Sequence, residues 1–125
     1  MGKLTDLADV ARTTGHRVIE HDGLDKVTGR MIPWQGFARS SNMDYPTGGP
    51  THVMMHHTAS QTTPANDVRW CNVNSPIRPI TNLLVDRFGT VHVCAAGPTN
   101  TNGQGADWWG GGTPPNAINL WAISI

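Results

Sequence analysis

Two adjacent histidines, His56 and His57, are the first candidates for chemistry in this sequence. The segment that holds them, Thr51 to Thr58, is short, apolar in its middle and flanked by turn residues, which predicts a buried strand. Neighbouring residues on a strand point to opposite faces, so only one of the two histidines can face a given site. From the residues alone, that histidine is either a structural side chain or one ligand of a metal site.

A second candidate is the pair Trp108-Trp109, which lies beside three glycines in a long loop from Gly97 to Pro115. Long loops without regular structure are usually functional or disordered. The two indoles could stack on the apolar face of a sugar, or they could anchor the loop to the core. The sequence leaves both readings open.

The other histidines do not obviously complete a metal site. His52 is four residues before His56, hence on the same strand face, but about 13 Å away at roughly 3.3 Å per residue. His92 lies on a predicted hairpin and could face either side, whereas His16 and His21 lie earlier in the chain. We therefore expect these four to be exposed or structural. The two cysteines form no CxxC motif, and Cys94 lies in an apolar run that predicts a buried thiol.

Several elements must position these residues. Apolar spacing predicts a helix from Leu4 to Thr14, and a second helix, with Pro64 in its first turn and Val68 and Cys71 inward, over 62–72. Strands are expected at 17–20, 80–85, 90–95 and 116–125. The strands 80–85 and 90–95 should form a hairpin, with Gly89 at a positive φ in its turn. Residues 30–50, with Trp34, Phe37 and Tyr45, should be an ordered loop or short strand.

Composition excludes some classes of function. Nine Lys and Arg balance nine Asp and Glu, so the chain lacks the basic excess that is typical of nucleic-acid binding. Its N-terminus has no apolar core of a secretory signal, and no stretch approaches the roughly 20 apolar residues of a membrane span. We expect no nucleic-acid partner and no membrane insertion.

Five segments, in order, resemble the type-2 N-acetylmuramoyl-L-alanine amidases, a family that includes amidase-type phage lysozymes and peptidoglycan recognition proteins. Val53 to Ser60 resembles the family's opening motif, an apolar strand that ends in His, His or Cys, and Ser/Thr-Ala. Asn82 to Val91 resembles its hairpin, and Asn116 to Ile125 its Asn-X-X-X-Ile-Gly-Ile strand. Ala96 to Gly103 lies where many members carry Asn-His-Ala-Gly. Leu4 to Glu20 looks like the lead-in of endolysins from phages of mycobacteria and their relatives.

The resemblance implies an α/β fold with a mixed central β-sheet flanked by helices, incomplete at the C-terminus. Strands at 51–57, 80–85, 90–95 and 117–125 would form that sheet. Residues 1–50 would be a helix-strand lead-in and loop, and residues 51–125 the N-terminal part of the amidase domain. The implied function is that of an endolysin: zinc-dependent hydrolysis of the amide bond between N-acetylmuramic acid and L-alanine in peptidoglycan, which lyses the host cell. Such a protein is made in the host cytoplasm without a signal peptide and acts on the cell wall after release.

The resemblance also implies roles for single residues. His56 falls on the family's first zinc ligand. Thr58 and Asn82 would line the rim for a peptide stem, and Trp108 and Trp109 would belong to the substrate groove. This sequence differs from the family at two further positions. Thr101 stands where the family has the histidine of Asn-His-Ala-Gly, and Thr81 stands where some members have a catalytic tyrosine.

The family's other two zinc ligands and its general base would come after Ile125, so the catalytic base is not assigned to a residue of this chain. Zinc needs three protein ligands to activate water and polarise a carbonyl. The alternative is therefore a truncated module without catalysis, which binds peptidoglycan or needs a second chain to complete its zinc site and cover the terminal strand.

Overall fold

The structure, a computed structural model, describes residues 2–56, 61–100 and 122–125. Its helices are α1 (Leu7–Arg12), the short η1 (Trp34–Gly36), α2 (Arg39–Asn42), α3 (Pro64–Arg69) and the wider turn η2 (Trp70–Asn74). Its strands are β1 (Val18–Glu20), β2 (Gly23–Leu24), β3 (Met31–Ile32), β4 (His52–Met54), β5 (Leu83–Val85), β6 (Val91–Val93) and β7 (Ala122–Ser124). Helices and strands interleave along the chain, as expected for an α/β protein.

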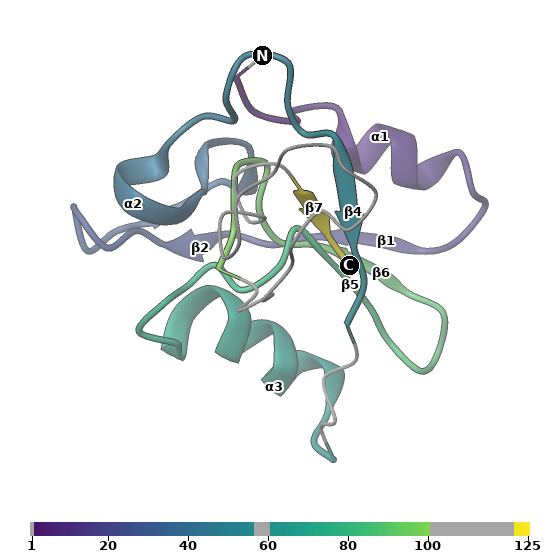
Figure 1. Cartoon of the computed structure of the whole chain (residues 1–125). Helices are drawn as coiled ribbons and strands as arrows, with labels where there is room; N and C mark the ends of the chain where they lie inside the picture. Colours follow the sequence, from purple (N-terminus) through teal and green to yellow (C-terminus); the bar gives the residue numbers. More distant parts are fainter. Residues whose placement is uncertain (1, 57–60, 101–121) are drawn as a thin grey trace.

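A three-stranded mixed sheet, in the order β1-β6-β5, lies at the centre of the fold (Figure 1). β1 runs parallel to β6 with Val18 opposite Val91, and β5 runs antiparallel to β6 with Leu84 opposite His92. Gly89 closes the β5–β6 turn at φ 82°, a conformation that glycine adopts without steric cost. The predicted hairpin, the positive φ of Gly89 and the mixed sheet of an α/β fold are confirmed.

Each face of this sheet carries its own apolar cluster. On one face, Leu7 and Ala8 of α1 pack with Trp34 and Val93. On the other face, Val68 of α3 and Cys71 of η2 pack with Leu84 and Cys94, in the second of these two clusters. Figure 1 shows α1 and α3 on opposite sides of the sheet. The sheet therefore lies between two helical layers. Cys94 is buried in the second cluster, as predicted.

The second predicted helix is present and has the start that its sequence indicates. Thr63 is its N-cap and accepts a hydrogen bond from the backbone N–H of Asn66 at 3.3 Å. Pro64 occupies the first turn, where its missing N–H costs nothing. Val68 and Cys71 are buried, as predicted.

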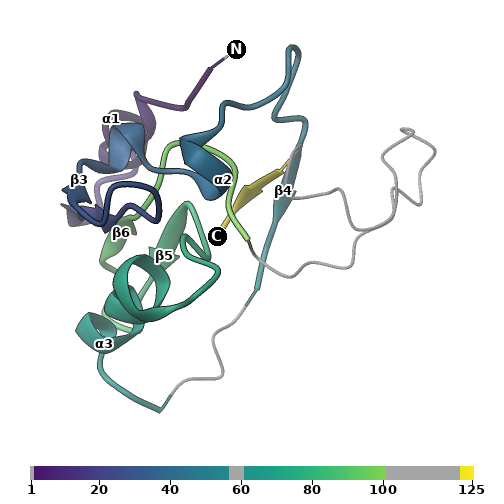
Figure 2. The same cartoon turned by 90° about the vertical axis from the view of Figure 1, so that its left-hand side faces the viewer.

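The four predicted strands do not form one sheet, and this expectation needs correction. β4 pairs in parallel with β7, His52 opposite Ala122, in a separate two-stranded sheet (Figure 2). The place beside β6 is taken by β1 instead, because Val18–Glu20 runs in register with Val91–Val93.

The prediction of a buried strand at 51–58 is also wrong for the residues that the structure describes. Val53 is 60% exposed and Met55 is 74% exposed. Since β4 has a pairing partner only in β7, its odd-numbered side chains face solvent rather than the three-stranded sheet.

The region between residues 30 and 50 is ordered, as expected, and anchors to the core through aromatic side chains. Trp34, Phe37 and Tyr45 are all buried. β2 and β3 form a small antiparallel pair with Leu24 opposite Met31. Among the described residues, none of the helices is long and apolar enough to cross a membrane.

Candidate functional site

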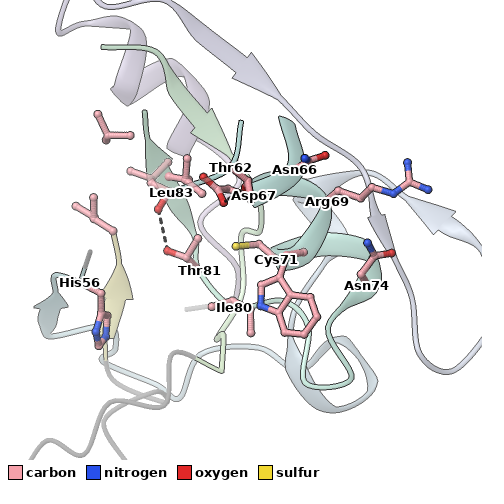
Figure 3. A pocket seen from close by; sticks show the side chains of 14 residues that line it. His56, Thr62, Asn66, Asp67, Arg69, Cys71, Asn74, Ile80, Thr81 and Leu83 are labelled. Atoms are coloured by element: carbon pink, nitrogen blue, oxygen red, sulfur yellow. Dashed lines mark hydrogen bonds between the residues drawn. The ribbon is translucent and has the colours of Figure 1, made fainter. Parts of the chain in front are cut away.

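A pocket of about 790 Å³ opens between α3, β5 and the end of β4 (Figure 3). Its lining includes polar side chains from Thr62, Asn66, Asp67, Asn74 and Thr81. Its apolar lining comes from Ile80, Leu83, Leu84, Val85 and Ile125. A concave space with an apolar wall and a few polar groups is the usual form of a ligand site.

His56 lines this pocket and is exposed. Its backbone N–H donates to the carbonyl oxygen of Ile125 at 3.0 Å, and the N–H of Ile125 donates to the carbonyl of Met54 at 2.9 Å. The β4–β7 ladder therefore holds His56 and Ile125 side by side at the carboxyl ends of two parallel strands. In Figure 3 the imidazole lies across the pocket from the side chains of α3 and η2.

The wall opposite His56 carries the other groups that could do chemistry. Thr62 donates its hydroxyl to Oδ1 of Asp67 at 3.0 Å, which fixes that carboxylate near the start of α3. Burial and then the nearby Asp67 raise the pKa of the Cys71 thiol to about 11. Cys71 is consequently protonated at neutral pH and is not an activated nucleophile.

Zinc needs three protein ligands in a catalytic site. In the described ranges, no group of three or more His, Cys, Asp or Glu is placed to hold a metal ion. Of the residues around the pocket, His56 is suited to be one ligand. The described residues thus do not make up a complete zinc site.

Asn82, expected at the rim of the substrate groove, lies in the interior instead. Its side chain is fully buried and donates to the carbonyls of Ala95 at 2.9 Å and Gly97 at 2.8 Å. Its Oδ1 accepts a hydrogen bond from the Tyr45 hydroxyl at 3.3 Å. Buried amides normally have such internal hydrogen-bond partners, and those of Asn82 tie the start of β5 to the segment after β6.

Three other expected site residues lie outside the described residues. These are Thr58, Trp108 and Trp109. The structure therefore brings His56 to the pocket, moves Asn82 away from it, and leaves the roles of the remaining three as predictions.

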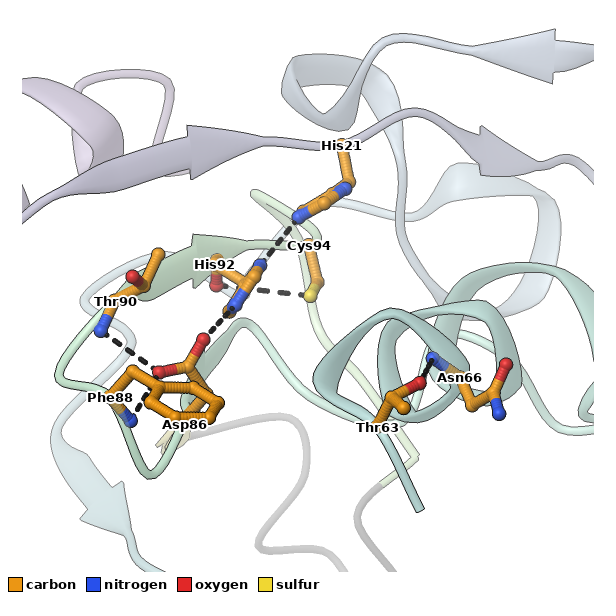
Figure 4. A network of polar contacts seen from close by, with 8 residues as sticks. All are labelled: His21, Thr63, Asn66, Asp86, Phe88, Thr90, His92 and Cys94. Carbon is orange, nitrogen blue, oxygen red and sulfur yellow. Dashed lines mark hydrogen bonds and ion pairs between the residues drawn. The ribbon is translucent and has the colours of Figure 1, made fainter.

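A chain of three side chains, Asp86, His92 and His21, crosses the α3 side of the sheet (Figure 4). Nε2 of His92 lies 2.8 Å from Oδ2 of Asp86, and Nδ1 of His92 lies 2.7 Å from Nε2 of His21. Because the Asp86 carboxylate only accepts, the Nε2–H of His92 donates to it. The chain joins the end of β1 to β6 and to the β5–β6 turn.

The surroundings of these groups shift their protonation. Burial, and next the neighbouring His92, lower the pKa of His21. Burial opposes ionisation of Asp86, yet hydrogen bonds from His92 and from the backbone N–H groups of Thr90 and Phe88 hold its pKa below the ordinary value. The arrangement therefore favours an ionised Asp86 and a neutral His21.

The row of Asp86, His92 and His21 was not predicted from the sequence, although the pairing of Asp86 with His92 could have been inferred from neighbouring residues. Asp86 lies two residues after Leu84, which is opposite His92 in the hairpin, so alternation places all three on one face. Nothing local indicates His21, because its approach depends on the parallel pairing of β1 with β6. His21 and His92 are structural, as expected for the histidines other than His56, and they do not line the pocket.

Comparisons with protein-family models, with characterised proteins and with solved structures give no match to this chain. The functional assignment accordingly rests on the motifs of the sequence and on the geometry around His56.

Proposed function

We propose that this chain is a peptidoglycan hydrolase domain that contributes to zinc-dependent cleavage of the amide bond between N-acetylmuramic acid and L-alanine. The single observation that supports the proposal is the position of His56. The histidine that the family motif marks as a metal ligand is exposed, lies just past the end of β4 and lines a pocket with polar side chains.

The pocket suits an amide substrate that joins a sugar to a peptide. Polar groups of Thr62, Asn66 and Asn74 offer hydrogen bonds to peptide and hydroxyl groups, and Leu83 and Ile125 provide an apolar wall. Zinc, when held with further ligands outside the described residues, would polarise the scissile carbonyl and activate water. The described residues would bind and orient the substrate beside His56.

A second function, binding of peptidoglycan without cleavage, is favoured by one specific feature. Trp70 lines the same pocket and is 54% exposed, although an exposed indole at a concave surface forgoes the burial that stabilises it. An aromatic face of this kind is suited to the apolar face of a sugar and needs no metal.

Zinc affinity and binding to insoluble peptidoglycan test these two functions separately. His56→Ala should weaken zinc binding by about tenfold or more, since loss of a ligand removes a coordinate bond, whereas His16→Ala should leave it unchanged. Asn66→Trp fills the pocket and should prevent co-sedimentation with peptidoglycan. Ala65→Trp, a change of the same kind on the same helix but outside the pocket lining, should not.

The outcomes separate the two proposals. Zinc binding that depends on His56, with sedimentation that depends on the pocket, supports the amidase. Pocket-dependent sedimentation without zinc binding supports the binding module. If wild-type protein binds neither zinc nor peptidoglycan, both proposals are wrong.

A further inference from the structure

Three cationic side chains converge around the turn between β2 and β3, on segments far apart in the sequence. Lys26 lies in this turn, Arg39 begins α2, and Arg78 precedes Pro79. Arg78 donates from Nε to the carbonyl of Leu24 at 2.6 Å. This bond holds its guanidinium at the backbone of Leu24, which is two residues before Lys26.

Further hydrogen bonds fix this arrangement. Asn42 of α2 donates from Nδ2 to Oδ1 of Asp25 at 2.9 Å, which attaches the helix that begins at Arg39 to the residue before Lys26. Arg78 also donates from a terminal nitrogen to the carbonyl of Ser75 at 3.0 Å. The guanidinium of Arg78 is thus held by two backbone carbonyls and keeps N–H groups for another acceptor.

Within the described residues, these three cations have no anionic partner. The ion pairs there engage Lys3, Arg12 and His92, and none engages Lys26, Arg39 or Arg78. Moreover, Nε of Arg39 is buried and has no hydrogen-bond partner within the described part of the chain. A buried donor without an acceptor costs free energy, so its retention points to an acceptor that the described residues do not provide.

The nearest carboxylate does not fill this role. Asp25 is buried, and its oxygens accept hydrogen bonds from Asn42 and from both the backbone N–H and the hydroxyl of Thr28. Burial, followed by repulsion from Arg78 and then Arg39, lowers the pKa of Lys26, so both arginines lie close enough to repel its ammonium group. A bound anion would relieve that repulsion.

We propose that Lys26, Arg39 and Arg78 form a binding site for a tetrahedral oxyanion, a phosphate group in particular. Arg78 and Arg39 present planar N–H donors, and Lys26 adds a point charge from a third direction. A phosphate group has enough oxygens to accept from all three, whereas a carboxylate is satisfied by one bidentate arginine. The whole chain has zero formal net charge, so the site is local and does not reflect a generally basic surface. This inference is independent of the function proposed for the pocket.

Titration with inorganic phosphate, followed by the amide NMR shifts of the full chain, tests the site. The shifts of Lys26, Arg39 and Arg78 should move together and saturate. Lys26→Gln and Arg39→Gln should each weaken phosphate binding by about tenfold, as expected for the loss of a charge-assisted hydrogen bond. Arg17→Gln removes the same charge from a remote exposed position and should leave the affinity unchanged.

Two further comparisons sharpen the test. Acetate should bind about tenfold more weakly than phosphate, because it lacks the additional oxygens. Dimethyl phosphate that binds as tightly as inorganic phosphate supports a phosphodiester as the natural group, and weaker binding supports a free or terminal phosphate.

Thermal unfolding without phosphate distinguishes a binding site from structural residues. Lys26→Gln and Arg39→Gln each remove a repelling charge and break no side-chain hydrogen bond among the described residues. These variants should therefore unfold at the same or a higher temperature than wild type. Phosphate should raise the unfolding temperature of the wild type and not that of the variants. The proposal is overturned if phosphate moves none of the three residues, or if Arg17→Gln weakens binding as much as Arg39→Gln does.

Discussion

The backbone N–H of His56 donates a hydrogen bond to the carbonyl oxygen of Ile125 at 3.0 Å. This contact continues the parallel pairing of β4 with β7 past the ends of both strands. It places both residues at one edge, where they line the same pocket. Carboxyl ends of parallel strands are a common location for ligand sites in α/β proteins, because loops that leave such an edge can surround a substrate.

The chain of Asp86, His92 and His21 predicts how stability depends on pH. The pKa of His21 is lower in the folded protein than its ordinary value of 6.5, so the unfolded chain takes up this proton at a higher pH than the folded one does. The contribution of neutral His21 to the free energy of unfolding is fully present above pH 6.5. It is lost as the pH falls from 6.5 towards the pKa of His21 in the folded protein. The free energy of unfolding in urea should therefore decrease between pH 7.5 and pH 5.

His21→Gln tests this origin of the pH dependence. The variant should be less stable at pH 7.5 by about 1 kcal/mol, the typical value of a lost hydrogen bond, and should lose less stability on acidification than wild type. His16→Gln, at an exposed position, should retain the wild-type slope. An unchanged slope in His21→Gln would show that other groups cause the pH dependence.

Asn82 should be a stability residue. Asn82→Ala leaves the carbonyls of Ala95 and Gly97 without their side-chain donor in a fully buried place, which should cost about 2–4 kcal/mol of unfolding free energy. Tyr45→Phe removes only the 3.3 Å hydrogen bond to Asn82 and should cost about 1 kcal/mol. Chemical denaturation of both variants measures the difference, and a stable Asn82→Ala protein with impaired peptidoglycan binding would restore its predicted place at the rim.

The contact of Gly23 with Phe37 predicts a severe effect of one methyl group. A Cβ at position 23 would overlap ring carbons of Phe37, whose side chain is buried in the core. Gly23→Ala should lower the unfolding free energy by more than about 3 kcal/mol, at the upper end of overpacking. At Gly36, an added Cβ meets no atom within 4 Å, so Gly36→Ala should be nearly neutral. Equal melting temperatures of the two variants would contradict the packing described.

Features that depend on neighbouring residues could be predicted from the sequence. Thr63 and Pro64 start α3, and Gly89 closes the hairpin, because capping, the fixed φ of proline and the freedom of glycine act over one to four residues. The burial of Val68 and Cys71 followed from their spacing on one helix face.

Features that depend on pairing between distant segments could not be predicted from the sequence. The sequence does not specify that β1, rather than β4, pairs with β6, since both segments are short and apolar and the choice depends on packing in three dimensions. The burial of Asn82 and the approach of His21 to His92 both follow from such pairing. The motif around His56 can be recognised in the sequence because it consists of neighbouring residues, and the role of His56 as a metal ligand stays a prediction.

We propose that His56 serves cleavage of the bond between muramic acid and L-alanine. Its most direct test is the appearance of new N-terminal L-alanine in purified peptidoglycan that is incubated with the chain and zinc. The account predicts that L-alanine amino groups appear with wild type and with His16→Ala, and fall by about a hundredfold or more with His56→Ala, as expected when a metal site loses a ligand. Release that is equal in His56→Ala and wild type, or no release by wild type, would contradict the account.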